Sequence, residues 1–147
     1  NLTGTLLACQ SAIGLFLGTG DGGSIVNVCS LQGMRGSPHL AAYGAAKAAV
    51  VHLTKTLALE HAPDAIRVNG VAPSFVETPA SAALVSAERR AASVKAIPLG
   101  FLSDPADIAG TVLAFASDLT RFVTGQVLIA DGGLSLTTAR PHRGQVG

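Results

Sequence analysis

The chain has 147 residues, of which 48% are hydrophobic and 13% are charged, and its formal net charge is +1. This length suits one domain with a substantial core, and this composition excludes a disordered chain. Because lysines and arginines form no cluster, we expect neither a nucleic acid nor a membrane surface as a partner.

A helix is expected over residues 1–18, where apolar residues recur near helical spacing. Asn1 is a residue type that caps helices, and the glycines from Gly18 to Gly23 are expected to end the helix in a turn. The apolar stretch LLACQSAIGLFLG is too short to span a bilayer and contains Gln10 and Ser11, so it predicts no membrane segment.

Three short runs predict strands that are buried on both faces. They are SIVNVCS at 24–30, AIRVNGVAP at 65–73 and the start of GQVLIADGG at 125–133. Helices are expected between them at 39–61, from Pro79 to about residue 96, and at 104–116. Asp104 is the expected cap of the last helix, with Pro105 at its first position.

Strands that alternate with helices predict an α/β fold, with a doubly wound parallel sheet covered by helices on both faces. The polar tail at 137–147 is expected to be frayed. Asn1 opens directly into a helical pattern without an initiator methionine, so we expect the chain to begin inside a domain.

Cysteine and histidine usage predicts no metal site. Cys9 and Cys29 are too few for a disulfide scaffold or a four-ligand zinc site, and the four histidines lack the spacing of metal ligands. We interpret both cysteines as buried thiols in a reducing compartment, which predicts a cytoplasmic protein.

The motif YGAAK places Tyr43 and Lys47 four positions apart, on one face of the predicted helix. This pair alone also fits a core tyrosine with a lysine that extends past it toward solvent. Ser30 closes the first predicted strand, and active sites of parallel sheets gather beyond the carboxyl ends of the strands. A serine, a tyrosine and a lysine are therefore expected to converge at one edge of the sheet.

Five motifs of the chain resemble the short-chain dehydrogenase/reductase family, in its single-domain, Rossmann-type form. They stand in the family's order and near its spacings: NLTG, GSIVNVCS, YGAAK, IRVNGVAPSFVET and FVTGQVLIADGG. The resemblance implies an oxidoreductase that uses NAD or NADP to interconvert a carbonyl and an alcohol by hydride transfer. Its substrate would be a small alcohol or ketone.

The resemblance also implies a catalytic tetrad. Tyr43 would be the acid/base at the substrate oxygen, and Ser30 would orient that oxygen. A phenol ordinarily ionises near pH ~10, so Lys47 would supply the neighbouring positive charge and would also hold the nicotinamide ribose. Asn1 would support a proton relay to the lysine.

The segment PSFVET resembles the part of the family that grips the nicotinamide carboxamide. The residues that would contact the coenzyme are Tyr43, Lys47, Pro73, Ser74, Val76 and Thr78. Ser74 stands where the family pattern has glycine, which would cost on the order of 1 kcal/mol if the position requires a positive φ.

The family's phosphate-binding glycine turn has no counterpart in the sequence. GTGDGG at 18–23 follows a helix and precedes a strand, whereas a phosphate cradle opens a helix, so we interpret it as a connecting turn. Residues 1–147 are therefore expected to form a single partial Rossmann-type domain, truncated and without the N-terminal βαβ part.

Two alternatives remain at this stage. The chain is either the catalytic half of such an enzyme or a catalytically silent fragment that acts through dimerising helices. An epimerase or dehydratase is disfavoured because NGVAPSFVET and GQVLIADGG match the single-domain reductases. The family resemblance implies a homodimer or homotetramer built through the helices at 1–18 and 39–61.

Overall fold

The computed structural model describes residues 1–136, so the predicted frayed tail at 137–147 lies outside the described residues. The elements follow the chain in the order α1 (Thr3–Thr19), β1 (Gly23–Val28), α2 (Ala41–His61), β2 (Ile66–Pro73), α3 (Pro79–Leu84), α4 (Ala87–Ala96), α5 (Pro105–Ala116) and β3 (Val127–Ala130). Short 3-10 turns lie at Leu31–Gly33, Ala62–Asp64 and Asp118–Thr120.

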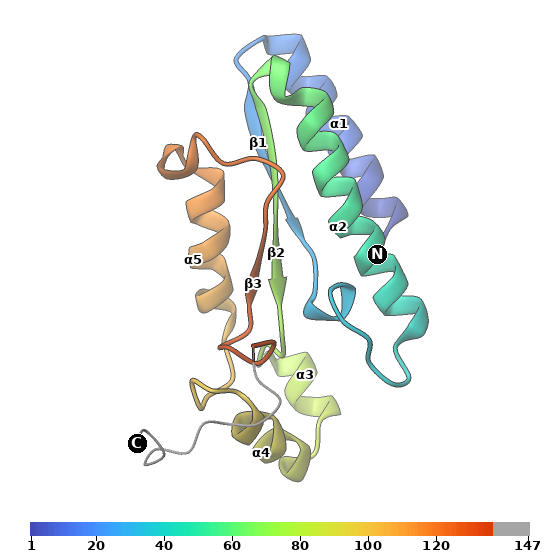
Figure 1. Cartoon of the computed structure of the whole chain (residues 1–147), viewed down its shortest axis with the longest axis vertical. Coiled ribbons are helices and arrows are strands. Elements are labelled where there is room, and N and C mark those ends of the chain that lie inside the picture. Colours follow the sequence, from blue (N-terminus) through green and yellow to red (C-terminus); the bar gives the residue numbers. More distant parts are fainter. Residues whose placement is uncertain (137–147) are drawn as a thin grey trace.

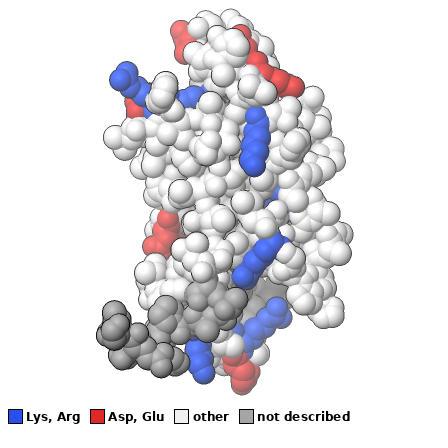
Figure 2. Space-filling view, viewed as in Figure 1, with Lys and Arg blue, Asp and Glu red and all other residues white. Residues whose placement is uncertain are grey.

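The three strands form one parallel sheet in the order β1-β2-β3. Helices α1 and α2 cover one face of the sheet and α5 covers the other, while α3 and α4 lie beyond the carboxyl ends of the strands (Figure 1). The predicted α/β fold with a parallel sheet and helices on both faces is confirmed. On the face shown in Figure 2, the charged side chains are scattered over a largely uncharged surface.

The central strand β2 carries the core. Every residue from Ile66 to Pro73 except Arg67 is buried, as a strand with neighbours on both edges and helices on both faces requires. On the α1/α2 side, Ile66 and Val68 pack against Cys9, Ile13 and other apolar side chains of the two helices.

A buried polar network joins the sheet to these helices. Asn27 of β1 donates from Nδ2 to Oγ1 of Thr54 at 3.0 Å and accepts from the Cys9 thiol at 3.4 Å. Thr54 donates in turn to the Val50 carbonyl at 2.8 Å. Cys9 and Cys29 are both free and buried, as predicted, and burial raises the pKa of each thiol.

Asn69 ties β2 to the segment that leads into β3. Its Nδ2 donates to the Val123 carbonyl at 2.9 Å, and its Oδ1 accepts from the Gln126 N–H at 3.0 Å. The side chain is fully buried, so both bonds are shielded from water.

The turn between α1 and β1 is the connecting turn that the sequence predicts. Gly20 takes a left-handed conformation at φ 75° and caps α1, with its N–H bonded to the Phe16 carbonyl. A side chain at Gly22 would come within 2.6 Å of the Ala65 carbonyl oxygen, so this turn packs directly against the start of β2.

Two predicted helix boundaries were wrong. Helix α1 begins at Thr3 after Leu2, without a side-chain cap, so Asn1 does not cap it. The predicted helix from Pro79 divides into α3 and α4, because Ser86 accepts a hydrogen bond from the Arg89 N–H and starts a new helix there.

Among the described residues, no helix combines the length and the apolar character needed to cross a bilayer. Within residues 1–136, no group of three or more His, Cys, Asp or Glu side chains is arranged to hold a metal ion.

Candidate active site

Tyr43 and Lys47 lie in the first turns of α2, on the side of the molecule to which the strands point. The Lys47 Nζ is 5.9 Å from the centroid of the Tyr43 ring, so the shared helix face brings the two side chains together as the spacing predicts. Tyr43 is 37% exposed, which leaves its ring open to a ligand.

Lys47 is fastened to the end of β1 by a hydrogen bond that the sequence did not indicate. Its Nζ donates to the Val28 carbonyl at 2.8 Å. An ammonium group has three donors, so this bond fixes the lysine and leaves two N–H groups for other partners. A backbone carbonyl carries no side-chain signal, which is why residue-type reasoning missed Val28.

Ser30 lies two residues beyond β1 and is 7% exposed. Its Oγ accepts a hydrogen bond from the Gln32 N–H at 3.2 Å, which starts the 3-10 turn Leu31–Gly33. The hydroxyl proton of Ser30 is not used in this bond, so it can be donated to a substrate oxygen.

Two glycines hold the loop after Ser30 against α2. A Cβ on Gly33 would lie 2.7 Å from the Lys47 carbonyl carbon, and a Cβ on Gly44 would lie 3.0 Å from the Gln32 carbonyl oxygen. Ser30 is thereby held on a loop that contacts the helix turn of Tyr43 and Lys47. Neither glycine was predicted from the sequence, although a glycine inside the helix motif YGAAK is a signal of close packing.

Asn1 lies just before α1, and its backbone carbonyl accepts a hydrogen bond from the Thr5 hydroxyl at 2.8 Å. Together with Lys47, Asn1 lines a cavity of about 580 Å³ that follows β1. The structure thus brings Asn1 and Lys47 to one cavity, whereas Ser30 and Tyr43 do not line it.

The predicted coenzyme segment follows β2 and is held by its own hydrogen bonds. Pro73 ends the strand, and the Ser74 N–H donates to the Ala130 carbonyl at 3.2 Å. The Val76 carbonyl accepts from the Ser81 hydroxyl at 2.9 Å, while the Thr78 hydroxyl accepts from the Ser81 N–H at 3.1 Å and caps α3. This segment is therefore a fixed surface next to the end of the sheet.

The strain considered for a serine at position 74 does not occur, because Ser74 does not have a positive φ. Within residues 1–136, the non-glycine residues with a positive φ are His39 and Ala65, so Ser74 is not left-handed. A serine there carries no backbone strain of the kind considered.

An ion pair joins this segment to α4. Arg90 contacts Glu77 through both carboxylate oxygens, with Nη2 donating to Oε2 at 2.8 Å. The hydrogen bond from Arg90, together with its charge, lowers the pKa of Glu77. The pair is exposed, so it links this segment to α4 but contributes little to the stability of the fold.

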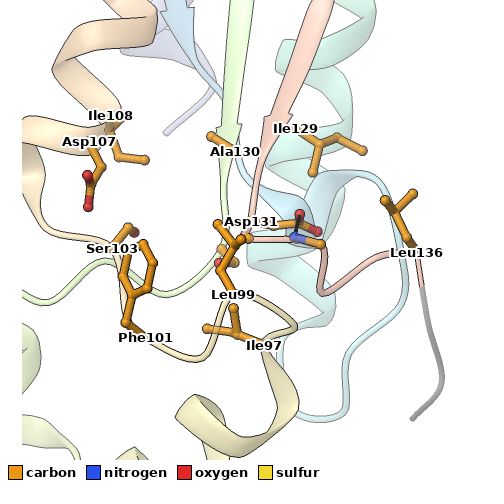
Figure 3. Close-up of a pocket in the computed structure, with 13 residues that line it drawn as sticks. Ile97, Leu99, Phe101, Ser103, Asp107, Ile108, Ile129, Ala130, Asp131 and Leu136 are labelled. Atoms are coloured by element: carbon orange, nitrogen blue, oxygen red, sulfur yellow. Dashed lines mark hydrogen bonds between the residues drawn. The ribbon is translucent and has the colours of Figure 1, made fainter. Parts of the chain in front are cut away.

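A separate apolar cavity of about 350 Å³ lies at the end of β3. Figure 3 shows Asp107 and Ile108 projecting from α5 on one side of it and Leu136 on the other. Ser74 is the one predicted site residue in its lining, so this cavity is distinct from the Tyr43–Lys47 region.

Comparisons with known proteins cover almost the whole described chain. A family model described as enoyl-(acyl carrier protein) reductase matches residues 1–135. A 3beta-hydroxysteroid dehydrogenase of Eggerthella lenta is 44% identical over 137 residues, which cover 92% of this chain and 52% of the relative.

Solved structures of related proteins match the fold over most of this chain. A putative 2-deoxy-D-gluconate 3-dehydrogenase from Agrobacterium tumefaciens with bound NADP is 36% identical with a TM-score of 0.88, and the match covers 93% of this chain and 56% of that one. A short-chain type dehydrogenase/reductase from Mycobacterium ulcerans is 33% identical with a TM-score of 0.88, with 97% and 51% covered. The chain spans about half the length of the relatives that it matches.

Proposed function

The chain belongs to the short-chain dehydrogenase/reductase family, and we propose that it carries the catalytic half of an NAD(P)-dependent oxidoreductase that interconverts a carbonyl and an alcohol. The observation that carries this proposal is the pairing of Tyr43 with Lys47, whose Nζ lies 5.9 Å from the tyrosine ring, beside the loop that holds Ser30. The substrate is a small alcohol or ketone.

In the reductive direction, the Tyr43 hydroxyl donates its proton to the substrate oxygen. Ser30 donates a hydrogen bond to the same oxygen and so stabilises the negative charge that develops on it. The positive charge of Lys47 favours the tyrosine anion that remains, and Asn1 supports the path by which a proton returns through Lys47. In the oxidative direction, the same groups act in reverse.

The residues present fit the nicotinamide end of NAD or NADP. Lys47 keeps two N–H donors for ribose hydroxyls, since only one is used by the Val28 carbonyl. The segment of Pro73, Ser74, Val76 and Thr78 offers a rigid surface for the carboxamide. The chemistry that a bound nicotinamide supplies is donation or acceptance of a hydride at the carbonyl carbon.

The relatives support both the proposed reaction on an alcohol or carbonyl and the proposed use of a nicotinamide coenzyme. The relative from Eggerthella lenta is a hydroxysteroid dehydrogenase, and the structure from Agrobacterium tumefaciens contains NADP. The glycine turn that would hold the pyrophosphate has no counterpart in this sequence. We therefore propose that this chain contacts the nicotinamide and ribose, and that it does not contribute the pyrophosphate cradle.

Turnover tests the proposal. The chain is mixed with NADH or NADPH and three carbonyl probes, namely cyclohexanone, ethyl acetoacetate and 4-oxopentanoate, and the absorbance of the reduced nicotinamide is followed. We expect Tyr43→Phe to lower the rate by about 10²- to 10⁴-fold, because the acid/base group is lost, while coenzyme binding is retained. Equal rates for the unaltered chain and Tyr43→Phe would refute the role of Tyr43. Absence of turnover by the unaltered chain would favour the catalytically silent module described below.

The alternative is a catalytically silent module that associates through α1 and α2. It is favoured by large apolar side chains that these helices leave exposed: Leu7 is 57% exposed, Leu15 is 72% and Leu59 is 80%. The same exposed side chains support a homodimer or homotetramer of the active form. Sedimentation should show Leu15→Glu as a monomer. Leu119 is an exposed leucine at the 3-10 turn Asp118–Thr120, and Leu119→Glu should keep the oligomer.

A cytoplasmic location is also proposed, because the two cysteines are free and buried.

A further inference from the structure

A cavity of about 310 Å³ lies beyond the carboxyl edge of the sheet, between α4, the loop after Ser30 and the turn after β3. Its lining includes Arg35, Phe75, Arg89, Ser93, Ile97 and Leu134. This volume lies at the lower end of the range of small-molecule pockets. A largely apolar wall to which two arginine residues contribute suits a ligand with an apolar stem and an anionic end.

Both arginines are available to such a ligand. Neither guanidinium makes a hydrogen bond or ion pair with a protein group in the part of the chain that the structure describes. The adjacent Arg90 differs, because Glu77 occupies it. No acidic side chain lies among the described residues that line the cavity, so the positive charges are not neutralised from within it.

Asp131 is a carboxylate that interacts with Arg35: burial raises its pKa, but hydrogen bonds from Ser135 and Gly133, together with the charge of Arg35, lower it overall. Asp131 does not line this cavity, and its two oxygens already accept from the Gly133 N–H at 2.9 Å and the Ser135 N–H at 2.7 Å. It therefore weakens the positive potential at Arg35 without occupying the guanidinium donors.

Two of the segments that line the cavity also carry residues of the proposed reaction site. Arg35 lies on the loop that begins at Ser30, and Phe75 directly precedes Val76 in the proposed coenzyme segment. The ion pair between Arg90 and Glu77 links α4, which also carries Arg89, to that segment. A molecule seated here therefore lies against two segments that also carry proposed site residues.

We propose that Arg35 and Arg89 bind the carboxylate of the substrate, and that this site takes an oxo acid or hydroxy acid whose aliphatic stem lies on Phe75, Ile97 and Leu134. Guanidinium groups bind carboxylates by charge-assisted hydrogen bonds, and two of them on separate elements give such a ligand a defined position. The assignment of this ligand as the substrate rests on the oxidoreductase function proposed above. The binding of the anion by this cavity is a separate property that can be measured without coenzyme.

The test is a titration of the complete 147-residue chain with hexanoate and with hexanamide, which share a stem and differ in charge, followed by NMR shifts of backbone amides. We expect saturable binding of hexanoate at least about tenfold tighter than that of hexanamide, weakening as salt is added. The shifts should centre on α4 and the loop at residues 31–40. Equal affinity for the two probes, or no saturable binding of hexanoate, would overturn the proposal.

Two variants locate the site. Arg35→Gln and Arg89→Gln should each weaken hexanoate binding about tenfold and leave hexanamide binding unchanged. Arg121→Gln is the matched control, because Arg121 is also exposed but lines a cavity at the amino-terminal ends of the strands. An effect of Arg121→Gln equal to that of Arg89→Gln would refute the assignment. Hexyl phosphate that binds tenfold tighter than hexanoate would overturn the choice of a carboxylate.

The outcomes separate this inference from the proposed function. Hexanoate binding without any turnover of carbonyl probes would support the anion site and count against the oxidoreductase role. Turnover of cyclohexanone by a chain that does not distinguish hexanoate from hexanamide would support the oxidoreductase and overturn the anion site.

Discussion

Replacement of Asn69 by alanine tests how β2 is tied to the segment before β3. The change removes two hydrogen bonds, from Nδ2 to the Val123 carbonyl at 2.9 Å and from the Gln126 N–H to Oδ1 at 3.0 Å. Each bond contributes about 0.5–1.5 kcal/mol net, and a buried group left without a partner costs about 1–3 kcal/mol. Because both remaining partners are backbone groups beside a fully buried position, we expect a loss of about 2–4 kcal/mol.

The loss is measured by urea denaturation followed by circular dichroism, with the unaltered chain alongside. It corresponds to a fall of the melting temperature by about 2–4 °C for each kcal/mol at this chain length. Gln126→Ala is the control, because that change removes an exposed side chain and keeps the backbone N–H that Asn69 accepts. A loss below about 1 kcal/mol for Asn69→Ala, or one no larger than that of Gln126→Ala, would refute the reasoning.

Two further predictions concern Asp131 and Gly33. Burial raises the pKa of Asp131, but hydrogen bonds from Ser135 and Gly133 and the charge of Arg35 outweigh this effect and lower the pKa overall. The ionised carboxylate therefore stabilises the fold at pH values above the ordinary pKa of about 4. That contribution is lost as the pH falls through the folded-state pKa. The urea midpoint of the unaltered chain should therefore exceed that of Asp131→Asn at pH 7, with the gap closing below about pH 4; a gap that stays constant would contradict this sign. Gly33→Ala would place a Cβ 2.7 Å from the Lys47 backbone and should cost about 1–3 kcal/mol, whereas Gly36→Ala, which meets no atom within 4 Å, should be close to neutral in the same denaturation assay.

The parts of the fold that short-range chemistry determines could be predicted from the sequence. Helix α5 starts where expected, because Asp104 and Asp107 exchange hydrogen bonds with each other's backbone N–H groups and Pro105 occupies the first turn. Strand β2 could be recognised because an apolar, β-branched run that ends at Pro73 suits a strand buried on both faces.

The helix starts that depend on whether a suitable residue acts as a cap could not be predicted. Ser86 and Asn1 are both suitable cap residues, but only Ser86 accepts a hydrogen bond from a helix N–H. Residue type alone does not decide this, because the cap also needs an extended backbone before the helix, which Ser86 has at φ −64° and ψ 157°.

For the candidate site, the spacing of Tyr43 and Lys47 was enough to predict that they share a helix face. The hydrogen-bond partner of Lys47 was not predictable. Every residue has a backbone carbonyl, and only the tertiary packing selects that of Val28. That Arg35 and Arg89 line one cavity was not predictable either, because they lie far apart in the sequence and only the tertiary packing of α4 beyond the carboxyl ends of the strands brings both to it.

The most direct test of the proposed function is a fluorescence titration of the chain with reduced nicotinamide mononucleotide, NADH and NADPH. If the chain grips only the nicotinamide and its ribose, all three should bind saturably with dissociation constants within about threefold of one another. Lys47→Met should weaken all three by about tenfold or more, because the ribose loses its charged donor. Binding of none of the three, or tenfold tighter binding of NADH or NADPH than of the mononucleotide, would contradict the account.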